Sequence, residues 1–500
     1  MQRGRFTRLV CAGVLTAGCI GWIACSKAGN GPATASADGG KVPITSQSEE
    51  ARKEYLQGRD LAEKLRAQES VAHFDKAIAL DTGFASAELA RANSAATAKD
   101  FFEHLNKAVS LAPKASEGER LLILANEAGA NGEVVKQKEY LDNLIALHPN
   151  DERVRFNLGN YYFAQQEYEQ AIAHYKKATE IAPSYSPAYN ILGYSYRQQG
   201  NYAEAEKAFQ KYVELIPDDP NPYDSYAELL LKMGRFDDSI AQYRRALAKD
   251  AHFMPSHFGT SADLMYQGKH AEAIAELQQM ADQARNDGER RTAYFGMAVV
   301  AVDSGKLDKA LQYMDQEYSV AEKKNDVAAM AADLQAKGNI LAEMQRYDAA
   351  QQTFERSQAL IENSDLSQAI KDNAKLLHHF NLTGLAIARK DIGTAKSHAQ
   401  QYRAGAEVSK NPGQLKLAHE LAGRIALAEK DYSAAITELE QSNDQDPRNL
   451  FRLSQAFQAR GNSDKAREYC KRAAEFYSLP QLNYAFIRAK AVKAAAAKKG

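Results

Sequence analysis

The 500-residue chain contains little tryptophan and little cysteine, with one Trp and four Cys. Trp22 and three of the cysteines lie in the first 25 residues, so Cys470 is the single thiol of the remaining sequence. A disulfide needs two cysteines, so an internal disulfide framework is excluded for residues 26–500. The fold of that part has to be stabilised by packing alone.

The chain also has no excess of charge, with 63 Lys and Arg against 64 Asp and Glu and a formal net charge of −1. A nucleic-acid-binding protein normally carries a basic excess in its folded body. We therefore expect no nucleic-acid partner. A content of 25% charged and 45% hydrophobic residues is that of an ordinary folded chain and excludes collagen, a fully disordered polymer and a polytopic membrane protein.

Motifs of the common catalytic sites are missing as well. The sequence has no H-E-x-x-H, no G-x-S-x-G elbow, no Walker loop, no Rossmann fingerprint and no C-x-x-C pair. The one adjacent histidine pair, His378-His379, is a poor metal site because neighbouring residues on a helix point about 100° apart. We predict no enzyme activity, no cofactor and no metal site.

Long apolar runs are confined to the N-terminus. Arg3, Arg5 and Arg8 precede the uncharged, mostly apolar run Leu9–Cys25 of 17 residues, which suits a signal segment and is at the lower limit for a membrane span. The following residues are rich in Gly, Ala and Ser, which is typical of a flexible tether. The sequence thus predicts a signal peptide over 1–24 and a tether over 25–50.

Two cysteines in this run follow a small residue, in Thr16-Ala17-Gly18-Cys19 and Trp22-Ile23-Ala24-Cys25. Each tetrad resembles the lipobox of bacterial lipoproteins. The resemblance implies lipidation of Cys25, with Cys19 as the alternative, and a lipid-anchored protein of the cell envelope. Ser26 in place of Asp implies the periplasmic face of the outer membrane. The alternative is an uncleaved signal-anchor in the inner membrane.

Pro149, Pro183 and Pro217 are spaced 34 residues apart, which is a period typical of helical repeats. The intervening sequences align, each with a Leu-Gly or Ile-Leu-Gly segment followed by aromatic residues and then by alanines. These positions resemble the tetratricopeptide-repeat (TPR) family, and they include Leu158, Gly159, Tyr161, Ala171, Tyr175 and Ala178 in one unit and Leu192, Gly193, Tyr196, Ala205, Phe209 and Tyr212 in the next.

The resemblance implies an all-α fold, a right-handed superhelical solenoid in which each unit covers the apolar face of the next. Units in phase start near Glu152, Ser186, Pro220 and Met254, and outward from these we expect about twelve helix pairs over 51–480. The basic segment 481–500 is predicted to form a C-terminal capping helix and tail.

By family resemblance the concave surface is lined by helix A residues at unit positions 2, 5, 9 and 12. A mixture of aromatic, amide and charged groups suits an extended peptide or helix, so the sequence predicts a non-catalytic scaffold for envelope protein or peptide partners. The alternative is a glycan or small molecule bound in a Tyr-rich groove, and a merely solvated face is the simplest interpretation. The candidate groove residues are Arg153, Phe156, Asn160, Asn190, Tyr194, Arg197, Asn221, Asp224 and Glu228.

Position 5 is Phe in five units, and the sequence leaves open whether these rings belong to the core or to the groove. The carboxylate clamp of co-chaperone TPR domains is not supported, because Asn160 lies far in sequence from Arg448 and Arg452. Cys470 occupies a helix B packing position, so we expect a buried structural thiol. The five phenylalanines are Phe156, Phe258, Phe295, Phe380 and Phe451.

Overall fold

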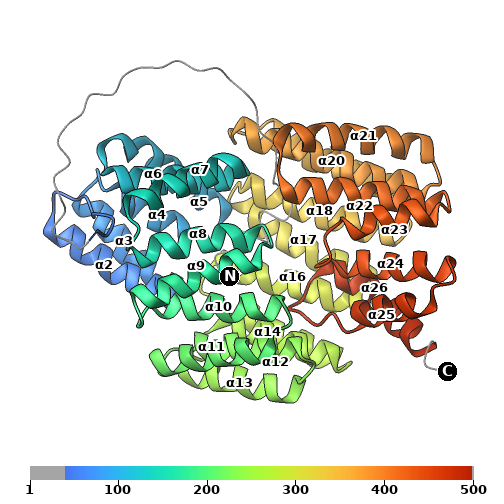
Figure 1. Ribbon diagram of the computed structural model, residues 1–500, viewed down its shortest axis with the longest axis horizontal. Coiled ribbons are helices and arrows are strands. Elements are labelled where there is room, and N and C mark those ends of the chain that lie inside the picture. Colours follow the sequence, from blue (N-terminus) through green and yellow to red (C-terminus); the bar gives the residue numbers. More distant parts are fainter. Residues whose placement is uncertain (1–39, 498–500) are drawn as a thin grey trace.

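The computed structural model describes residues 40–497, and within that range every regular element is helical (Figure 1). The first helices are α2 (Glu49–Glu63), α3 (Ala67–Leu80), α4 (Ala85–Asn93), α5 (Ala98–Leu111), α6 (Glu117–Asn131), α7 (Val134–Leu147), α8 (Glu152–Ala164), α9 (Tyr168–Ile181), α10 (Ser186–Gln198), α11 (Tyr202–Leu215), α12 (Asn221–Lys232) and α13 (Phe236–Lys249), with a short 3-10 turn at Ala112–Lys114.

The second half continues in the same manner and ends in one unpaired helix. Its helices are α14 (Met254–Tyr266), α15 (His270–Asp282), α16 (Asp287–Asp303), α17 (Leu307–Lys323), α18 (Val327–Glu343), α19 (Tyr347–Glu362), α20 (Gln368–Ala388), α21 (Ile392–Ser409), α22 (Pro412–Ala428), α23 (Tyr432–Glu440), α24 (Pro447–Ala459), α25 (Ser463–Ala474) and α26 (Leu482–Ala497).

Helices α2 to α25 form twelve consecutive pairs, and each pair packs on the next. The predicted all-α solenoid of about twelve units is confirmed for the described residues. We number the pairs 1 to 12 and call the even-numbered helix of each pair helix A and the odd-numbered one helix B. Helices α8, α10 and α14 start at the predicted residues, and α12 starts one residue later than predicted.

Glycines on the A helices allow the two helices of a pair to approach closely. A Cβ atom on Gly159 would lie 2.5 Å from Tyr175, and a Cβ on Gly193 would lie 2.7 Å from Phe209. Real Cβ atoms do not come this close to a ring, so the packing requires a residue without a side chain. Glycine at these positions therefore lets a helix B aromatic ring pack directly against helix A.

The turns between helices A and B use the left-handed backbone region. Gly200, Gly234, Gly268 and Gly305 have φ between 75° and 79°, which glycine adopts without strain. Equivalent turns also place non-glycine residues in this region, with φ between 61° and 65°, at Gln166, Gln345, Lys390 and Lys430. No glycine marks those turns in the sequence.

Residues 40–48 precede the first helix and run along the starts of A helices. The Val42 amide donates to Asp151 (2.8 Å), and the Thr45 amide donates to Glu119 (3.0 Å). Ser46 donates to Asp81 through its hydroxyl (2.7 Å). These bonds tie the end of the predicted tether region to the end of pair 1 and to the first helices of pairs 3 and 4.

The superhelix turns back on itself, so that pairs 1–4 lie against pairs 8–12 (Figure 1). We define the seam as the contacts between the A-to-B turns of pairs 1–4 and the starts of helices α16, α18, α20, α22 and α24. Its hydrogen bonds join Gln68 to Asn286, Ala98 and Lys99 to Asp326, Asn131 to Ser367 and Asn373, Gly132 to Asn411, and Gln166 to Lys416 and Asn443.

Helix α26 packs on α24 and α25 and also reaches back to α16. Tyr484 is 1% exposed, and its hydroxyl donates to the Ala474 carbonyl oxygen. Arg488 forms an ion pair with Asp303 of α16. Cys470 is fully buried beside this helix, which confirms the expected structural thiol.

Candidate functional site

The nine predicted groove residues lie on α8, α10 and α12, three on each helix. We call the sides of these helices that carry them the inner faces. Arg153, Asn160 and Arg197 are partly exposed. The other six are buried, so most of these side chains are not accessible at the surface of this structure. Their exposed fractions are 9% for Phe156, 3% for Asn190, 3% for Tyr194, and 1% each for Asn221, Asp224 and Glu228.

A polar network connects the inner faces of neighbouring A helices. The Tyr194 hydroxyl donates to Glu228 Oε1 over 2.9 Å, and Arg197 donates to Glu228 Oε2 over 3.3 Å. The Arg197 guanidinium also lies over the Tyr194 ring, 4.6 Å from its centre. These two donors compensate the charge of the buried Glu228 carboxylate. A charged group that is removed from water needs such partners.

The segment around Asp224 takes part in packing between pairs. Ser256 of α14 donates to Asp224 Oδ1 (2.9 Å), and Asn221 donates to the Tyr212 hydroxyl (2.6 Å). Asn160 likewise accepts a hydrogen bond from Tyr175 (2.8 Å). These inner-face groups are therefore already engaged within the stack.

The turn between α2 and α3 covers one side of the inner face. Arg153 of α8 donates to Glu63 at the end of α2 (2.7 Å), although the two helices belong to pairs 4 and 1. Asp219, just before α12, is buried, and this burial raises its pKa to about 6 against the opposing effect of Arg66 and Lys64 in the same turn.

The segment after α25 packs at the ends of α12 and α14. The Lys232 ammonium lies 4.0 Å from the centre of the Phe476 ring. Burial lowers the pKa of Lys232 to about 7, and the nearby Arg197 lowers it further in the same direction. Tyr477 packs edge-on against Phe236, and the Tyr266 hydroxyl donates to the Ser478 carbonyl oxygen over 2.6 Å.

The five position-5 phenylalanines do not form a uniform apolar stripe. Phe156 and Phe258 are 9% and 8% exposed and belong to hydrophobic clusters. Phe295, Phe380 and Phe451 are partly exposed, and each packs against a neighbouring cluster. The rings are core residues with partial access to solvent.

Histidine is the residue type most relevant to metal binding here. His379 of α20 and His398 of α21 place their Nδ1 atoms 3.1 Å apart, in a contact that the sequence did not predict. Within residues 40–497 no group of three or more His, Cys, Asp or Glu side chains is placed to hold a metal ion.

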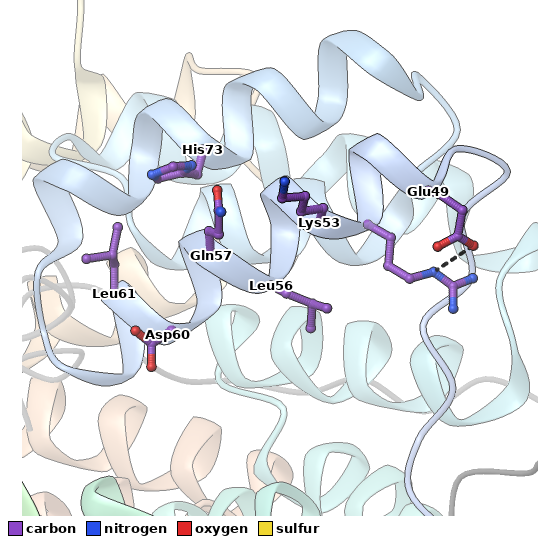
Figure 2. Close-up of a pocket in the computed structure, with 8 residues that line it drawn as sticks. Glu49, Lys53, Leu56, Gln57, Asp60, Leu61 and His73 are labelled. Atoms are coloured by element: carbon purple, nitrogen blue, oxygen red, sulfur yellow. Dashed lines mark ion pairs between the residues drawn. The ribbon is translucent and has the colours of Figure 1, made fainter.

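An open pocket of about 670 Å³ lies on the first helix pair, outside the predicted groove. Figure 2 shows Gln57 on the side of α2 that faces His73 of α3, whereas Leu56 and Asp60 point to the other side. The residues that line this pocket include acidic, basic and neutral groups and none of the nine predicted residues. The pocket therefore defines no recognisable chemistry.

The predicted lipidation residue Cys25, its alternative Cys19 and the signal peptide 1–24 lie outside the described residues. Across 40–497, none of the helices combines the length and the hydropathy that a bilayer crossing requires.

Comparison with known proteins identifies the repeats. Tetratricopeptide-repeat family models match residues 153–185, 185–250, 262–326 and 334–364. These ranges contain α8 to α12 and their inner-face residues. The chain belongs to the TPR family, and its repeats form the stacked helix pairs described above.

Curated relatives match only part of the chain. Hsp70-Hsp90 organizing protein 3 of Arabidopsis thaliana is 29% identical over 125 residues, which cover 25% of this chain and 21% of the relative. Superkiller complex protein 3 of Mus musculus is 28% identical over 111 residues, or 22% of this chain and 7% of the relative. The chain thus spans about a fifth or less of the length of these relatives.

Among solved structures, the Cut9-Hcn1 hetero-tetramer of the APC/C is similar over 85% of this chain and 76% of that chain, at 15% identity and a TM-score of 0.40. Pseudomonas aeruginosa pilF is similar over 45% of this chain and 95% of its own, at 20% identity and a TM-score of 0.31.

Proposed function

We propose that this protein is a non-catalytic scaffold that binds a peptide or protein partner along the inner faces of its A helices, at the surface of the bacterial envelope. The observation that carries the binding function is the TPR match over 153–364, which includes the inner faces of α8 to α12. The polar and aromatic groups on these faces suit recognition of a peptide backbone and its side chains.

The binding proposal is tested by site-specific photo-crosslinking in intact cells. A photoreactive phenylalanine replaces Phe163, a partly exposed ring on α8 at one of the predicted lining positions. The matched control replaces Tyr140, a partly exposed ring on helix B of pair 3. We expect a discrete protein adduct from position 163 and none from position 140. Adducts from position 140 alone would move the binding surface to the B helices.

The anchoring proposal rests on the two lipobox-like tetrads and on the length of the apolar run that contains them. Several acyl chains on one cysteine are sufficient for stable membrane attachment. We propose the lipid at Cys25 and the periplasmic face of the outer membrane as the location, with a signal-anchor in the inner membrane as the competing arrangement.

Anchoring is tested by mass spectrometry of the mature N-terminus. Cys25→Ser should abolish acylation, and the matched variant Cys19→Ser should retain it; the reverse result would assign the lipid to Cys19. Cleavage before Cys25 also removes Trp22, the only tryptophan, so the purified protein should show tyrosine emission alone. An intact segment 1–24 would favour the signal-anchor, and membrane fractionation would then locate the protein. Tryptophan emission from a chain acylated at Cys19 would instead show cleavage before Cys19, which retains Trp22.

A further inference from the structure

Four helix pairs share one side-chain contact, in which a residue of helix A meets the helix B residue 19 positions later. In three of these pairs a histidine Nδ1 faces a glutamate oxygen over 2.5–2.7 Å. The carboxylate is a suitable partner for an imidazole, because it accepts a hydrogen bond and compensates the charge of the protonated ring. The contacts are His73 with Glu54 in pair 1, His257 with Glu276 in pair 7, and His419 with Glu438 in pair 11.

Pair 10 has a second histidine where the other three pairs have the glutamate. His379 of α20 and His398 of α21 place their Nδ1 atoms 3.1 Å apart, and their ring centres lie 5.3 Å apart. Two neutral imidazoles share at most one N–H···N hydrogen bond in this arrangement. Across residues 40–497, no third His, Cys, Asp or Glu joins them in a group placed to hold a metal ion. The contact therefore consists of two ring nitrogens without a carboxylate.

We infer that His379 and His398 form a binding site for one divalent transition-metal ion, held by the two Nδ1 atoms with water at its remaining positions. Neutral imidazole is a common ligand of Cu²⁺, Ni²⁺ and Zn²⁺. Ca²⁺ and Mg²⁺ bind oxygen ligands, which this pair does not provide. For a site of given ligands the affinity of divalent ions is highest for Cu²⁺, so Cu²⁺ binds more tightly here than Ni²⁺ or Zn²⁺.

The distance between the two nitrogens suits a shared ion. Metal–imidazole bonds are about 2.0–2.1 Å long, so two nitrogens 3.1 Å apart form an angle of about 100° at the ion. This angle lies between those of square-planar and tetrahedral coordination. The two rings are inclined by 33° and face each other. A rotation of each ring about its Cβ–Cγ bond, whose torsional minimum is broad, points both lone pairs at the ion.

Both rings of the pair are partly exposed, so an ion and its waters can reach them from solvent. The neighbouring imidazole of His378 is not a ligand of this site, because adjacent residues of a helix point in different directions and its ring centre lies 6.3 Å from that of His379. The bound ion would connect α20 to α21. Metal binding should therefore stabilise pair 10, since only the folded pair brings the two nitrogens together.

The first test is titration calorimetry of the full chain, without an affinity tag, with Cu²⁺ and with Ni²⁺ alone. The variants are His379→Gln and His398→Gln. The matched control is His419→Gln, which removes a histidine from the same 19-residue contact where the partner is Glu438. We expect each pair 10 variant to weaken Cu²⁺ binding by at least about tenfold and the control to retain it. Melting temperatures without metal establish that every variant is folded.

The second test is electron paramagnetic resonance of the bound Cu²⁺, which counts the coordinating nitrogens. We expect two imidazole nitrogens in the wild type and one in each pair 10 variant, and slower hydrogen exchange of α20 and α21 when the metal is present. Equal Cu²⁺ binding by the wild type and both variants would mean an adventitious ion only and would overturn the site. So would the absence of binding up to millimolar Cu²⁺, or an equal loss in His419→Gln.

Discussion

At the scale of single residues, the inner face combines charged groups with almost complete removal from water. Glu228 is compensated by Tyr194 and Arg197, so its burial is supported by specific bonds. Lys232 is covered by an aromatic ring, and its pKa is lowered to about 7 by burial first and by Arg197 second. The ammonium form of Lys232 is therefore disfavoured in the folded chain.

Lys232→Met should stabilise the protein at pH 7 by roughly 1–3 kcal/mol, because it keeps the apolar stem over Phe476 and removes the desolvated charge. The folded pKa lies below the unfolded one, so the unfolded chain binds more protons between about pH 7 and 10, and wild-type stability rises over that range. The advantage of the variant should therefore shrink as the pH rises.

Thermal unfolding from pH 7 to pH 10 measures this effect. Lys323→Met is the matched control, because Lys323 is an exposed lysine in the last turn of α17, as Lys232 is in the last turn of α12. If Lys232→Met and wild type had equal melting temperatures from pH 7 to pH 10, the Lys232 ammonium would be better solvated than its buried position beside Phe476 indicates.

At the scale of elements, several helix pairs depend on close approach at one glycine of helix A. Gly338 of α18 is the tightest of the pair-packing glycines that face a phenylalanine, since a Cβ atom there would lie 2.3 Å from the Phe354 ring. Gly338→Ala should destabilise pair 9 by about 1–3 kcal/mol through overpacking. Gly393→Ala in α21 is the matched control, because its Cβ would have no neighbour closer than 3.7 Å.

Hydrogen exchange of α18 and α19 reports the stability of this pair directly, and the melting temperature reports the whole chain. For the control we expect no loss, and a gain of up to about 1 kcal/mol from higher helix propensity. If Gly338→Ala left the stability of pair 9 unchanged, the Phe354 ring would have to rotate into space elsewhere in the pair.

Helices α20 and α21 contain the histidine contact, and it makes pair 10 sensitive to acid. Burial lowers the pKa of His379, and His398 lowers it further; burial also lowers the pKa of His398. Because the folded pKa values lie below the unfolded ones, the unfolded chain binds protons first as the pH falls. The stability present above about pH 6.5 is therefore lost progressively below it.

His379→Gln should make the fall in melting temperature between pH 7.5 and pH 5 smaller by roughly 1–2 °C. His104→Gln is the control, because His104 pairs with the Glu88 carboxylate and not with a second histidine. An unchanged acid sensitivity in His379→Gln would assign the pH effect to carboxylates elsewhere.

At the scale of the whole molecule, α26 and the seam convert a linear stack into a closed body. Tyr484 of α26 lies in the same hydrophobic cluster as residues of α14 and α16. Tyr484→Ala should cost about 3–5 kcal/mol and reduce exchange protection in α16 as well as in α25. Val492→Ala, on the same helix at 45% exposure, should have little effect. Loss of protection in α25 alone would mean that α26 is only a local cap.

The pattern of proline, glycine and aromatic residues was sufficient to predict the helix pairs, because those residues act within one unit or between neighbours. The nine predicted groove residues lie on three adjacent A helices, and their role in binding stays a prediction. The burial of six of them was not predictable. It depends on partners in other helices, such as Glu228 for Tyr194, Tyr212 for Asn221 and Ser256 for Asp224.

The sequence by itself determined the repeat, the positions of close helix contact and the number of pairs, since each of these follows from side-chain size at a fixed spacing. Only the tertiary structure decided that the superhelix closes on itself. That closure results from the accumulated rotation of about seven pairs, which brings Ala98 to Asp326 across 228 residues. No local pattern encodes such a sum of small rotations. This sum decides whether pairs 1–4 meet pairs 8–12.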